Sequence, residues 1–448
     1  MPARLPCFKV YDVRGKVPGE LNAEIAYSVG RALADETGCK TCVIGHDIRL
    51  SSAEISHGLA EGLRAAGVDV IDIGLCGTEM IYFATANYDY GAGVMITASH
   101  NPPEYNGMKI VREGSRPISG DSGLWEIERR VREQDFSRAG SGSFTQRDVY
   151  EEFTKHLLSV VNPSDLKPLS VLSNPGNGCA GIALRALALK VPLRIRELDY
   201  EPDGTFPKGV PNPILEESHV ETGTIMRAEQ FDFGAAWDGD YDRCFFFDET
   251  GAFVDGYYMV GLLVQDTLEN HPGATIIHDP RCIWNTLDIC ERLGGRPVMC
   301  KTGHAFIKER MRAEDATYGG EMSAHHYFKE HWFCDSGMIP FLMVARLIGR
   351  SGRTLSDHVG EMMERFPVSG EINSVVDDAP SAIARVRAAY PGGVEDQTDG
   401  LSLAFDTWRF NVRSSNTEPI VRLNVESRGD KTLVEEKSAE ILRVLRYP

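Results

Sequence analysis

Three segments of the chain repeat one order of elements: an apolar strand, a polar turn, a helical stretch and a second apolar strand. They begin at TCVIGHDIRLSS, LSVLSNPGNG and ATIIHDPRC. Strands that alternate with helices of this length are typical of βαβ units, whose sheets are parallel or mixed. The pattern therefore predicts three related α/β domains, more than a single dinucleotide-binding sheet requires.

The end of the chain follows a different pattern. PVSGEINSVV, LSLAFDTWRFNVRSS and PIVRLNVESRG are predicted as strands, whereas SAIARVRAAY and EEKSAEILRVLRY are predicted as helices. The expected fold class is α/β, with three similar mixed α/β domains followed by a C-terminal α+β domain. The expected boundaries are residues 1–143, 144–250, 251–365 and 366–448, and the Gly/Ser-rich residues 139–143 are the expected first linker.

The charge of the chain excludes one broad class of function. Lys and Arg number 47 and Asp and Glu number 65, so the net charge is −18. A general nucleic-acid binder needs an excess of positive charge for its phosphate contacts. We therefore expect no nucleic-acid partner, although a local basic site for a small anion is compatible with this charge.

The N-terminus and the cysteines indicate a cytoplasmic protein. The N-terminus lacks the apolar core of a signal peptide, and no apolar run is long enough to span a membrane. The ten cysteines are scattered, and the one C-x-x-C, Cys39 and Cys42, has no second pair to complete a zinc site. A reduced chain with buried thiols and no membrane partner is expected.

The first candidate loop is Thr97–Pro102, TASHNP, which follows the apolar run Gly93–Ile96. Ser99 should lie where this strand gives way to a loop, where a serine can act as a nucleophile or carry a phosphate. His100 is its neighbour, and Lys109 could neutralise a phosphate. An ordinary capped turn is the alternative.

The second candidate loop contains three carboxylates, Asp238, Asp240 and Asp242, on alternate residues. Such residues converge on one hard cation when a loop curls, and oxygen ligands favour Mg²⁺ or Ca²⁺. An EF-hand is the first alternative, but Arg243 stands where its glycine belongs and Cys244–Phe247 is predicted as a strand. A haloacid-dehalogenase-like phosphotransferase, which also uses D-x-D after a strand, is the second.

A third pattern suggests an unrelated enzyme class. Gly176, Gly178 and Gly181 form a G-x-G-x-x-G after a predicted strand, and Glu197 and Asp199 follow at the distance of a ribose-binding acid. An NAD-dependent dehydrogenase is therefore an alternative. A tight strand-to-helix turn with a structural role explains the same glycines.

Two further loops carry polar side chains suited to a phosphosugar. Glu321, Ser323 and His325 stand on alternate residues, so in an extended loop they would face one side and could hold sugar hydroxyls. His304 lies upstream. The segment Arg413–Pro419, RSSNTEP, offers an arginine and several hydroxyl and amide donors for a dianionic phosphate. A surface loop and a polar hairpin are the respective alternatives.

Together these loops resemble those of the α-D-phosphohexomutase family. TASHNP is similar to its phosphoserine loop, DGDYDR to its metal loop, GEMSAH to its sugar-binding loop and RSSNTEP to its phosphate-binding loop, in the family's order. Tyr11–Gly15 also fits the family's start. With Met322, the sugar loop is similar to that of the family's phosphomannomutases, including those that also act on glucose phosphates. Phosphoglucosamine mutases typically have Gln there.

The resemblance implies four domains in a heart shape around a central cleft, and it implies roles for individual residues. Ser99 would bear the transferable phosphoryl group and complete a Mg²⁺ site. Arg14, Lys109, Arg243 and Arg413 would make the cleft locally basic. At Arg281 the family often has Lys. The implied catalytic residues are Ser99, His100, Lys109, Arg243 and His304; the metal ligands are Ser99, Asp238, Asp240 and Asp242; the substrate-binding residues are Tyr11, Arg14, Arg281, Glu321, Ser323, His325, Arg413, Ser415, Asn416 and Thr417.

The implied activity is an isomerase that interconverts hexose 6- and 1-phosphates through a hexose 1,6-bisphosphate, which is also the expected activator. Mannose phosphates are the expected substrates, with phosphoglucomutase as the alternative main activity. A metal-dependent sugar-binding protein without turnover is the non-enzymatic alternative. The expected assembly is a monomer or a small homo-oligomer.

Overall fold

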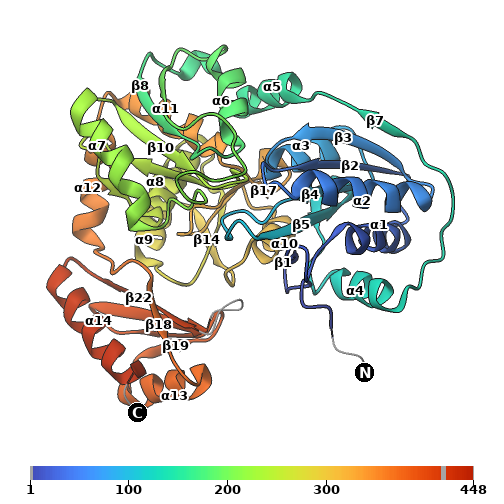
Figure 1. Cartoon of the computed structure of the whole chain (residues 1–448). Coiled ribbons are helices and arrows are strands. Elements are labelled where there is room, and N and C mark those ends of the chain that lie inside the picture. The colour runs from blue at the N-terminus through green and yellow to red at the C-terminus, as the bar shows by residue number, and fades with distance from the viewer. Residues whose placement is uncertain (1–3, 415–419, 447–448) are drawn as a thin grey trace. The chain divides into compact units, whose positions relative to one another are not determined.

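The computed structural model describes residues 4–414 and 420–446, which divide into two compact units (Figure 1). The first unit contains residues 4–253 and 325–352. The second contains residues 254–324, 353–414 and 420–446. Each unit combines mixed or antiparallel sheets with covering helices.

The first unit begins with a seven-stranded mixed sheet of order β1–β5–β4–β2–β3–β7, with β6 beside β5. The central strand β4 is buried at all five residues, as expected for a strand covered on both faces. The strands are β1 (Val13–Lys16), β2 (Thr41–His46), β3 (Asp69–Leu75), β4 (Ala92–Ile96), β5 (Tyr105–Arg112), β6 (Arg116–Pro117) and β7 (Phe144–Gln146), and the helices are α1 (Ala23–Thr37), α2 (Ser52–Ala65), α3 (Thr78–Asn87), α4 (Leu124–Glu133) and the 3₁₀ turn η1 (Glu113–Ser115).

The first sheet extends past the linker expected at residues 139–143. The amides of Gly140 and Gly142 donate to carbonyls at the end of α2, at 3.0 and 2.9 Å. The next residues form β7, which pairs in parallel with β3. Small residues here allow a close approach of two backbones, which composition alone does not distinguish from flexibility. The Gly/Ser-rich stretch is therefore a packed segment, and residues 144–146 belong to the first sheet.

The second sheet of this unit has the order β12–β11–β10–β8–β9. Strand β10 pairs in parallel with β8 and antiparallel with β11, so the loop between β10 and β11 is the turn of a hairpin. The elements are β8 (Ser170–Asn174), β9 (Arg194–Glu197), β10 (Phe233–Trp237), β11 (Cys244–Phe247), β12 (Phe253–Val254), β16 (His326–Phe328), β17 (Cys334–Asp335), α5 (Tyr150–Val160), α6 (Ala180–Ala188), α7 (His219–Glu229), α11 (Met338–Ser351) and the 3₁₀ turns η2 (Pro163–Asp165), η3 (Glu216–Ser218) and η4 (Lys329–His331).

The second unit contains a parallel group of strands, in which β13 pairs with β14 and β15. It also contains an antiparallel sheet of order β18–β22–β21–β20–β19, against which α13 and α14 pack (Figure 1). The elements are β13 (Thr275–His278), β14 (Arg296–Met299), β15 (Tyr318–Gly320), β18 (Ile372–Val375), β19 (Val394–Asp396), β20 (Leu401–Ala404), β21 (Trp408–Ser414), β22 (Ile420–Ser427), α8 (Gly256–Asn270), α9 (Trp284–Leu293), α10 (His304–Glu314), α12 (Leu355–Arg365), α13 (Ala379–Ala389) and α14 (Lys431–Arg446).

Residues 401–414 of the segment LSLAFDTWRFNVRSS, expected as a strand, form a tight hairpin of two strands. The Phe405 amide donates to the Trp408 carbonyl at 2.9 Å and closes the turn between β20 and β21. Only two polar residues, Asp406 and Thr407, lie in this turn, and the rings of Phe405 and Trp408 on either side of them stack with centroids 4.7 Å apart.

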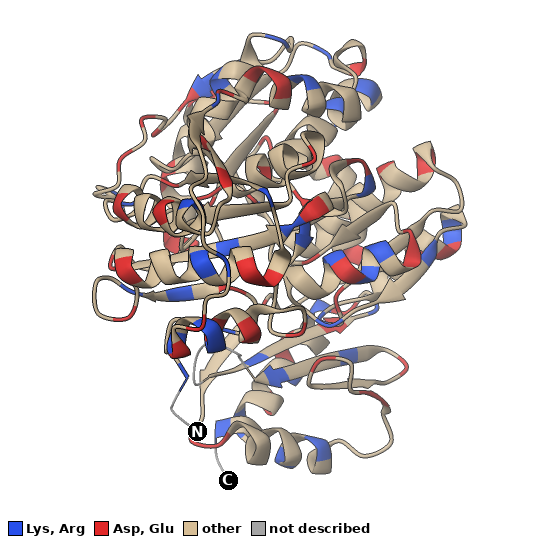
Figure 2. Ribbon diagram, turned by 90° about the vertical axis from the view of Figure 1, so that its right-hand side faces the viewer, with Lys and Arg blue, Asp and Glu red and all other residues tan. Residues whose placement is uncertain are grey.

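Acidic and basic residues are interspersed along the helices (Figure 2). Many form pairs one turn apart, such as Arg129 with Glu126 at 2.7 Å. Among residues 4–414 and 420–446, no helix is both long enough and apolar enough to cross a membrane.

Helices α1 and α2 approach so closely that only glycine fits at their contact. A Cβ at Gly62 would lie 2.0 Å from the Tyr27 carbonyl oxygen, and one at Gly58 would lie 2.4 Å from that of Ala23. Both obstacles are backbone atoms of the neighbouring helix, which cannot rotate away. The sequence of α2 is thus constrained by the helix it packs against.

We expect Gly62→Ala to destabilise the first unit by about 1–3 kcal/mol, because the two helices must separate to admit the methyl group. Gly360→Ala in α12 is the matched control, since nothing lies within 4 Å of a Cβ there; it should stabilise by about 0.4–1 kcal/mol. Thermal unfolding and hydrogen exchange of α1 and α2 measure both effects. Equal behaviour of the two variants would contradict the close packing of α1 on α2.

Candidate active site

Ser99 lies just beyond β4, as the sequence predicts, and it is buried in a strained turn. Its φ is +50°, in the left-handed region that non-glycine residues rarely occupy. Its amide donates to Thr97 Oγ1 at 2.8 Å. Such strain persists only where the surroundings enforce it, and it clusters at functional sites.

Arg49, which the sequence analysis did not select, enforces this turn. Its guanidinium donates to four backbone carbonyls of the loop: those of Ser99 (2.9 Å), Asn101 (2.6 Å), Pro102 (2.8 Å) and Tyr105 (2.9 Å). Asp47 pairs with Arg49 at 3.3 Å and both are buried. Arg49 therefore shapes the loop that presents Ser99.

A repeated motif in the sequence could have identified Arg49. His46-Asp47-Ile48-Arg49 ends β2, and His278-Asp279-Pro280-Arg281 ends β13. In both copies the arginine amide donates to the aspartate, at 3.0 and 2.9 Å. The two βαβ units thus share a turn that places an arginine at the carboxyl end of a parallel strand.

The three aspartates follow β10 and precede β11, so two strands flank the loop and an EF-hand is excluded. Tyr241 in the loop has φ +45°. A Cβ at Gly239 would lie 2.7 Å from the Ser99 carbonyl oxygen, so glycine is required for this loop to reach the Ser99 turn. Ser99 Oγ donates to Asp238 Oδ2 at 2.7 Å. The structure therefore brings together the serine and the acidic loop.

One oxygen of each aspartate is held by donors. Asp238 Oδ2 accepts from Arg243 Nε at 2.8 Å, in addition to the Ser99 hydroxyl. Asp240 Oδ2 accepts from Lys109 Nζ at 2.7 Å and from Thr78 Oγ1 at 2.5 Å. Asp242 Oδ2 accepts from the same ammonium. Each carboxylate is thus fixed along one edge.

The other oxygen of each aspartate, Oδ1, is buried and accepts no hydrogen bond from the described residues. The three carboxylates contribute oxygens that lie within 4.8 Å of one another. Buried oxygens without donors are costly unless a cation satisfies them. This donor set of clustered carboxylate oxygens fits a hard divalent cation such as Mg²⁺.

The pKa values of this cluster also favour a bound cation. Burial raises the pKa of Asp242, and the neighbouring Asp240 raises it further. Burial would also raise the pKa of Asp240, but Lys109 outweighs it and holds that pKa below its usual value. Asp242 therefore does not ionise readily beside Asp240, and a divalent cation would relieve the repulsion between these two carboxylates.

Lys109 carries a firm positive charge. Burial alone would lower its pKa, but Asp240 and Asp242 hold the pKa well above its usual value. Lys109 lies on β5, which pairs antiparallel with β4, so the sheet places its ammonium beside the Ser99 turn. It is suited to neutralise negative charge on a phosphoryl group and poorly suited to accept a proton.

His100 is a neutral ring. Burial first, and then the charge of Arg243, hold its pKa well below the usual value. Its Nδ1 lies 3.1 Å from Ser99 Oγ and also contacts Arg243 Nη2. Because Nδ1 already accepts from the guanidinium, His100 is better placed to orient Arg243 and Ser99 than to act as a base.

A second group of candidate ligands shares Asp242. His325 and Asp335 each bring one ligand atom to within 4.8 Å of it, and His325 Nε2 lies 3.7 Å from Asp242 Oδ1. Asp335, on β17, was not selected from the sequence, where a lone aspartate carries no signal. His325 is thereby placed at the acidic cluster, within the first unit.

The loop with Glu321 and Ser323 is a turn, which corrects the expectation of an extended segment. Ala324 has φ +68°, and its amide donates to the Glu321 carbonyl at 3.0 Å. The alternation argument fails because it holds only for extended backbone. Glu321 Oε1 accepts from the Gly303 amide at 3.0 Å, and Ser323 Oγ lies 3.3 Å from Arg281 Nη2.

Three arginines of the second unit converge on one carboxylate, Glu371, which sequence analysis missed. Its oxygens lie 3.1 Å from Arg413, 3.3 Å from Arg422 and 3.4 Å from Arg281. Burial would raise the pKa of Glu371, but these arginines hold it below its usual value. The cluster places Arg413 beside two further guanidinium groups. Ser415, Asn416 and Thr417 lie outside the described residues.

The remaining predicted residues are placed as follows. Arg14, on β1, donates to Asn101 Oδ1 at 2.6 Å and so reaches the Ser99 loop. Tyr11 precedes β1 and is partly buried. His304 is the first residue of α10, in the second unit.

Each of the four cations expected in the cleft has a carboxylate partner. Arg14 pairs with Asp12, Lys109 with Asp240, Arg243 with Asp238 and Arg413 with Glu371. Each cation is buried or partly buried and needs a carboxylate to offset its desolvation. The cations are therefore oriented by their carboxylate partners.

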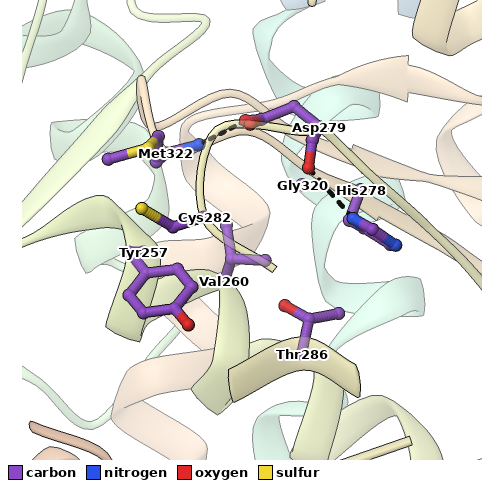
Figure 3. A pocket seen from close by; sticks show the side chains of 8 residues that line it. All are labelled: Tyr257, Val260, His278, Asp279, Cys282, Thr286, Gly320 and Met322. Carbon is purple, nitrogen blue, oxygen red and sulfur yellow. Dashed lines mark hydrogen bonds between the residues drawn. The ribbon is translucent and has the colours of Figure 1, made fainter. Parts of the chain in front are cut away.

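A small pocket in the second unit is lined in part by Met322 (Figure 3). Asp279 Oδ2 accepts from the Met322 amide at 3.0 Å and holds that turn. Burial lowers the pKa of His278 and favours its neutral form. The pocket has no cationic lining residue and does not suit a phosphate; it is lined by Tyr257, Val260, His278, Asp279, Cys282, Thr286, Gly320 and Met322.

The structure gives the dinucleotide pattern a structural explanation. Glu197 pairs with Arg185 at 2.6 Å and Asp199 with Lys208 at 2.8 Å. A Cβ at Gly181 would lie 2.5 Å from the Tyr200 carbonyl oxygen. Packing of α6 thus accounts for the glycine, and both acids are engaged with basic side chains.

Four domain families match the chain in order. They are described as phosphoglucomutase/phosphomannomutase alpha/beta/alpha domains I, II and III and the C-terminal domain, and they match residues 6–138, 150–251, 255–366 and 371–444. The chain belongs to the phosphoglucomutase/phosphomannomutase family. It is therefore an enzyme of the isomerase class, an intramolecular phosphotransferase.

Relatives cover the whole chain. Phosphohexose mutases of Xanthomonas campestris pv. campestris are 53% identical over 446 residues, 99% of each chain. Phosphomannomutase of Escherichia coli K12 is 50% identical over 452 residues, again 99% of each. A phosphoglucomutase/phosphomannomutase family protein from Burkholderia thailandensis has a similar structure, with a TM-score of 0.87, 30% identity and coverage of 98% and 97%.

We expect Lys109→Met to lower the thermal midpoint without Mg²⁺, because breaking a buried ion pair costs about 3–5 kcal/mol. Added Mg²⁺ should raise the variant's midpoint more than the wild type's, since the cation replaces the lost charge. Lys155→Met is the control: Lys155 pairs with Glu151 in solvent, 68% and 70% exposed, and should change neither value. An equal Mg²⁺ response in wild type and Lys109→Met would contradict the assignment.

Proposed function

We propose that this enzyme is a phosphomannomutase that interconverts mannose 6-phosphate and mannose 1-phosphate through a phosphorylated Ser99. The observation that carries the proposal is the contact of Ser99 Oγ with Asp238, at 2.7 Å, within a buried carboxylate cluster suited to Mg²⁺. Relatives about 50% identical over the whole chain carry the name phosphomannomutase. Its substrate-binding residues would come from the loops named above.

The proposed reaction has two half-reactions. In the first, a hydroxyl oxygen of the hexose monophosphate attacks the phosphorus of phosphoserine. The bond from phosphorus to Ser99 Oγ breaks and Ser99 Oγ takes up a proton, while the hydroxyl proton of the sugar passes to a base, which yields a hexose 1,6-bisphosphate. In the second, Ser99 Oγ gives up its proton to a base and attacks the phosphorus of the other phosphate. The bond from that phosphorus to the sugar oxygen breaks, the oxygen takes up a proton, and the sugar leaves as the isomeric monophosphate.

Positioning and charge neutralisation dominate such a transfer. Mg²⁺ held by Asp238, Asp240 and Asp242 would supply charge stabilisation at the phosphoryl group. Arg243 and Lys109 are oriented by those aspartates and add fixed positive charge beside Ser99. Arg49 keeps the serine in its strained turn, and His100 lies against its hydroxyl. His304 stays a candidate for proton transfer.

Substrate recognition is assigned to two kinds of group. Arg413, with Arg281 and Arg422 gathered by Glu371, suits the phosphate that does not react. Glu321, Ser323 and His325 suit sugar hydroxyls. Such a division allows the bisphosphate to bind in either orientation, because each of its phosphates can occupy the arginine group in turn.

Phosphoglucomutase activity is the second candidate, because the matched families are named for both activities. The two substrates differ only in the configuration at C2. The ratio of kcat/KM for mannose 1-phosphate and glucose 1-phosphate decides between them. A cytoplasmic location, activation by hexose 1,6-bisphosphate and a monomer or small homo-oligomer belong to the same proposal.

We expect Ser99→Ala to lower mutase kcat by about 10³-fold or more, because removal of a nucleophile removes its covalent intermediate. A coupled assay with mannose 1-phosphate and a catalytic amount of hexose 1,6-bisphosphate measures this. Intact-mass spectrometry should find one phosphate on the wild type after incubation with the bisphosphate and none on the variant. Ser159→Ala, at an exposed serine of α5, is the control. Retained turnover in Ser99→Ala would refute the proposal.

A further inference from the structure

We propose that Thr78 is a positioning residue for the metal loop, whose hydroxyl decides which oxygen of Asp240 is left for the cation. The inference rests on the metal site of the proposed function and extends it to a helix outside the metal loop. Thr78 is the first residue of α3 and is fully buried. It would act through Asp240 and would not itself touch substrate or metal.

Two hydrogen bonds join Thr78 to Asp240. The hydroxyl donates to Asp240 Oδ2 at 2.5 Å, and the Thr78 amide donates to the Asp240 carbonyl at 3.0 Å. The second bond fixes the backbone of Asp240 and the first fixes the rotation of its carboxylate. A residue that binds both the main chain and the side chain of a ligand controls where the ligand atom lies.

The pattern of donors on Asp240 is one-sided. Oδ2 accepts from both Thr78 and Lys109, whereas Oδ1 is buried and accepts from none of the described residues. Lys109 alone does not fix this edge, because its ammonium is shared between Asp240 and Asp242. The short hydroxyl of Thr78 supplies the directional bond.

The hydroxyl has no competing role in its own helix. The N-cap of α3 is Gly77, and no side chain caps this end. Gly77 lies against the ring of Tyr241, so the helix start and the metal loop are packed together. Residues 78–85 of α3 are all buried, which leaves Thr78 little freedom to move away from Asp240. The geometry is therefore built into the core.

Helix α3 connects the loop that contains Ser99 with the metal loop. The helix leads along the chain into β4, and Ser99 follows β4. The first residue of α3 holds Asp240, and the end of the helix leads into the strand that precedes Ser99. The helix therefore helps to fix the position of the cation relative to Ser99. Displacement of a ligand atom by a fraction of an ångström would lower the affinity for the cation more than it would lower the stability of the fold.

The test is Mg²⁺ binding by isothermal titration calorimetry on unphosphorylated full-length protein, confirmed by intact mass. Thr78→Val removes the hydroxyl and keeps the shape, and we expect Mg²⁺ affinity to fall about 10–100-fold. Thr78→Ser keeps the hydroxyl and should restore the affinity to within about threefold of wild type. Mn²⁺ electron paramagnetic resonance on the same variants gives a spectroscopic reading of the site. Asp240→Asn sets the value for a damaged site.

Thr85→Val is the matched control. Thr85 is a buried threonine of the same helix whose hydroxyl donates to the Ile81 carbonyl at 2.7 Å. It should lower the thermal midpoint without changing Mg²⁺ affinity. If Thr78→Val unfolds, Thr78→Ala and Thr78→Ser supply the comparison.

The outcomes distinguish the positioning role of Thr78 from the metal site itself. Unchanged Mg²⁺ affinity in Thr78→Val, or an equal loss in Thr85→Val, would overturn the positioning role while the metal site stands. Failure of the wild type to bind Mg²⁺ at this loop would overturn the metal site and this inference together. Retained Ser99 phosphorylation in that case would leave the mutase reaction itself intact.

Discussion

The first unit depends on holding three carboxylates together out of water. Asp238, Asp240 and Asp242 are fully or almost fully buried, and like charges at such distances repel strongly in a medium of low polarity. Arg243 and Lys109 offset part of this charge along one edge of the cluster. The Oδ1 atoms of the same carboxylates accept from no donor among the described residues, an arrangement that fits a divalent cation. The requirement explains why elements of two sheets and the start of α3 all meet at this loop.

A similar arrangement occurs with the signs reversed in the second unit. There Arg281, Arg413 and Arg422 surround a single carboxylate, Glu371. A group of guanidinium ions would repel one another without this anion, and its carboxylate holds them together. A chain with a net charge of −18 can thus handle phosphorylated sugars, because local pairing sets the field at each site.

The strands next to the candidate site and its acidic loop could be predicted from the sequence, because they depend on neighbouring residues. Apolar runs next to Ser99 and next to Asp238 predict strands, and the structure has β4 and β10 there. Three aspartates on alternate residues predict a shared cation site, and one oxygen of each lies within 4.8 Å of the others. The prediction that Glu321, Ser323 and His325 face one side of an extended loop was wrong, because the backbone turns at Ala324. Alternate residues share a side only in an extended chain.

The chain by itself determined the strand-and-helix order, the chemistry of each loop and the family, because those depend on residue type and spacing along a few positions. Only the tertiary structure decided which groups meet. Arg49, Thr78 and Glu371 lie 50, 162 and 42 positions from Ser99, Asp240 and Arg413, and no local pattern connects them. They are brought together by sheet order and helix packing, and burial then makes each charge and hydroxyl take the partner that the fold provides.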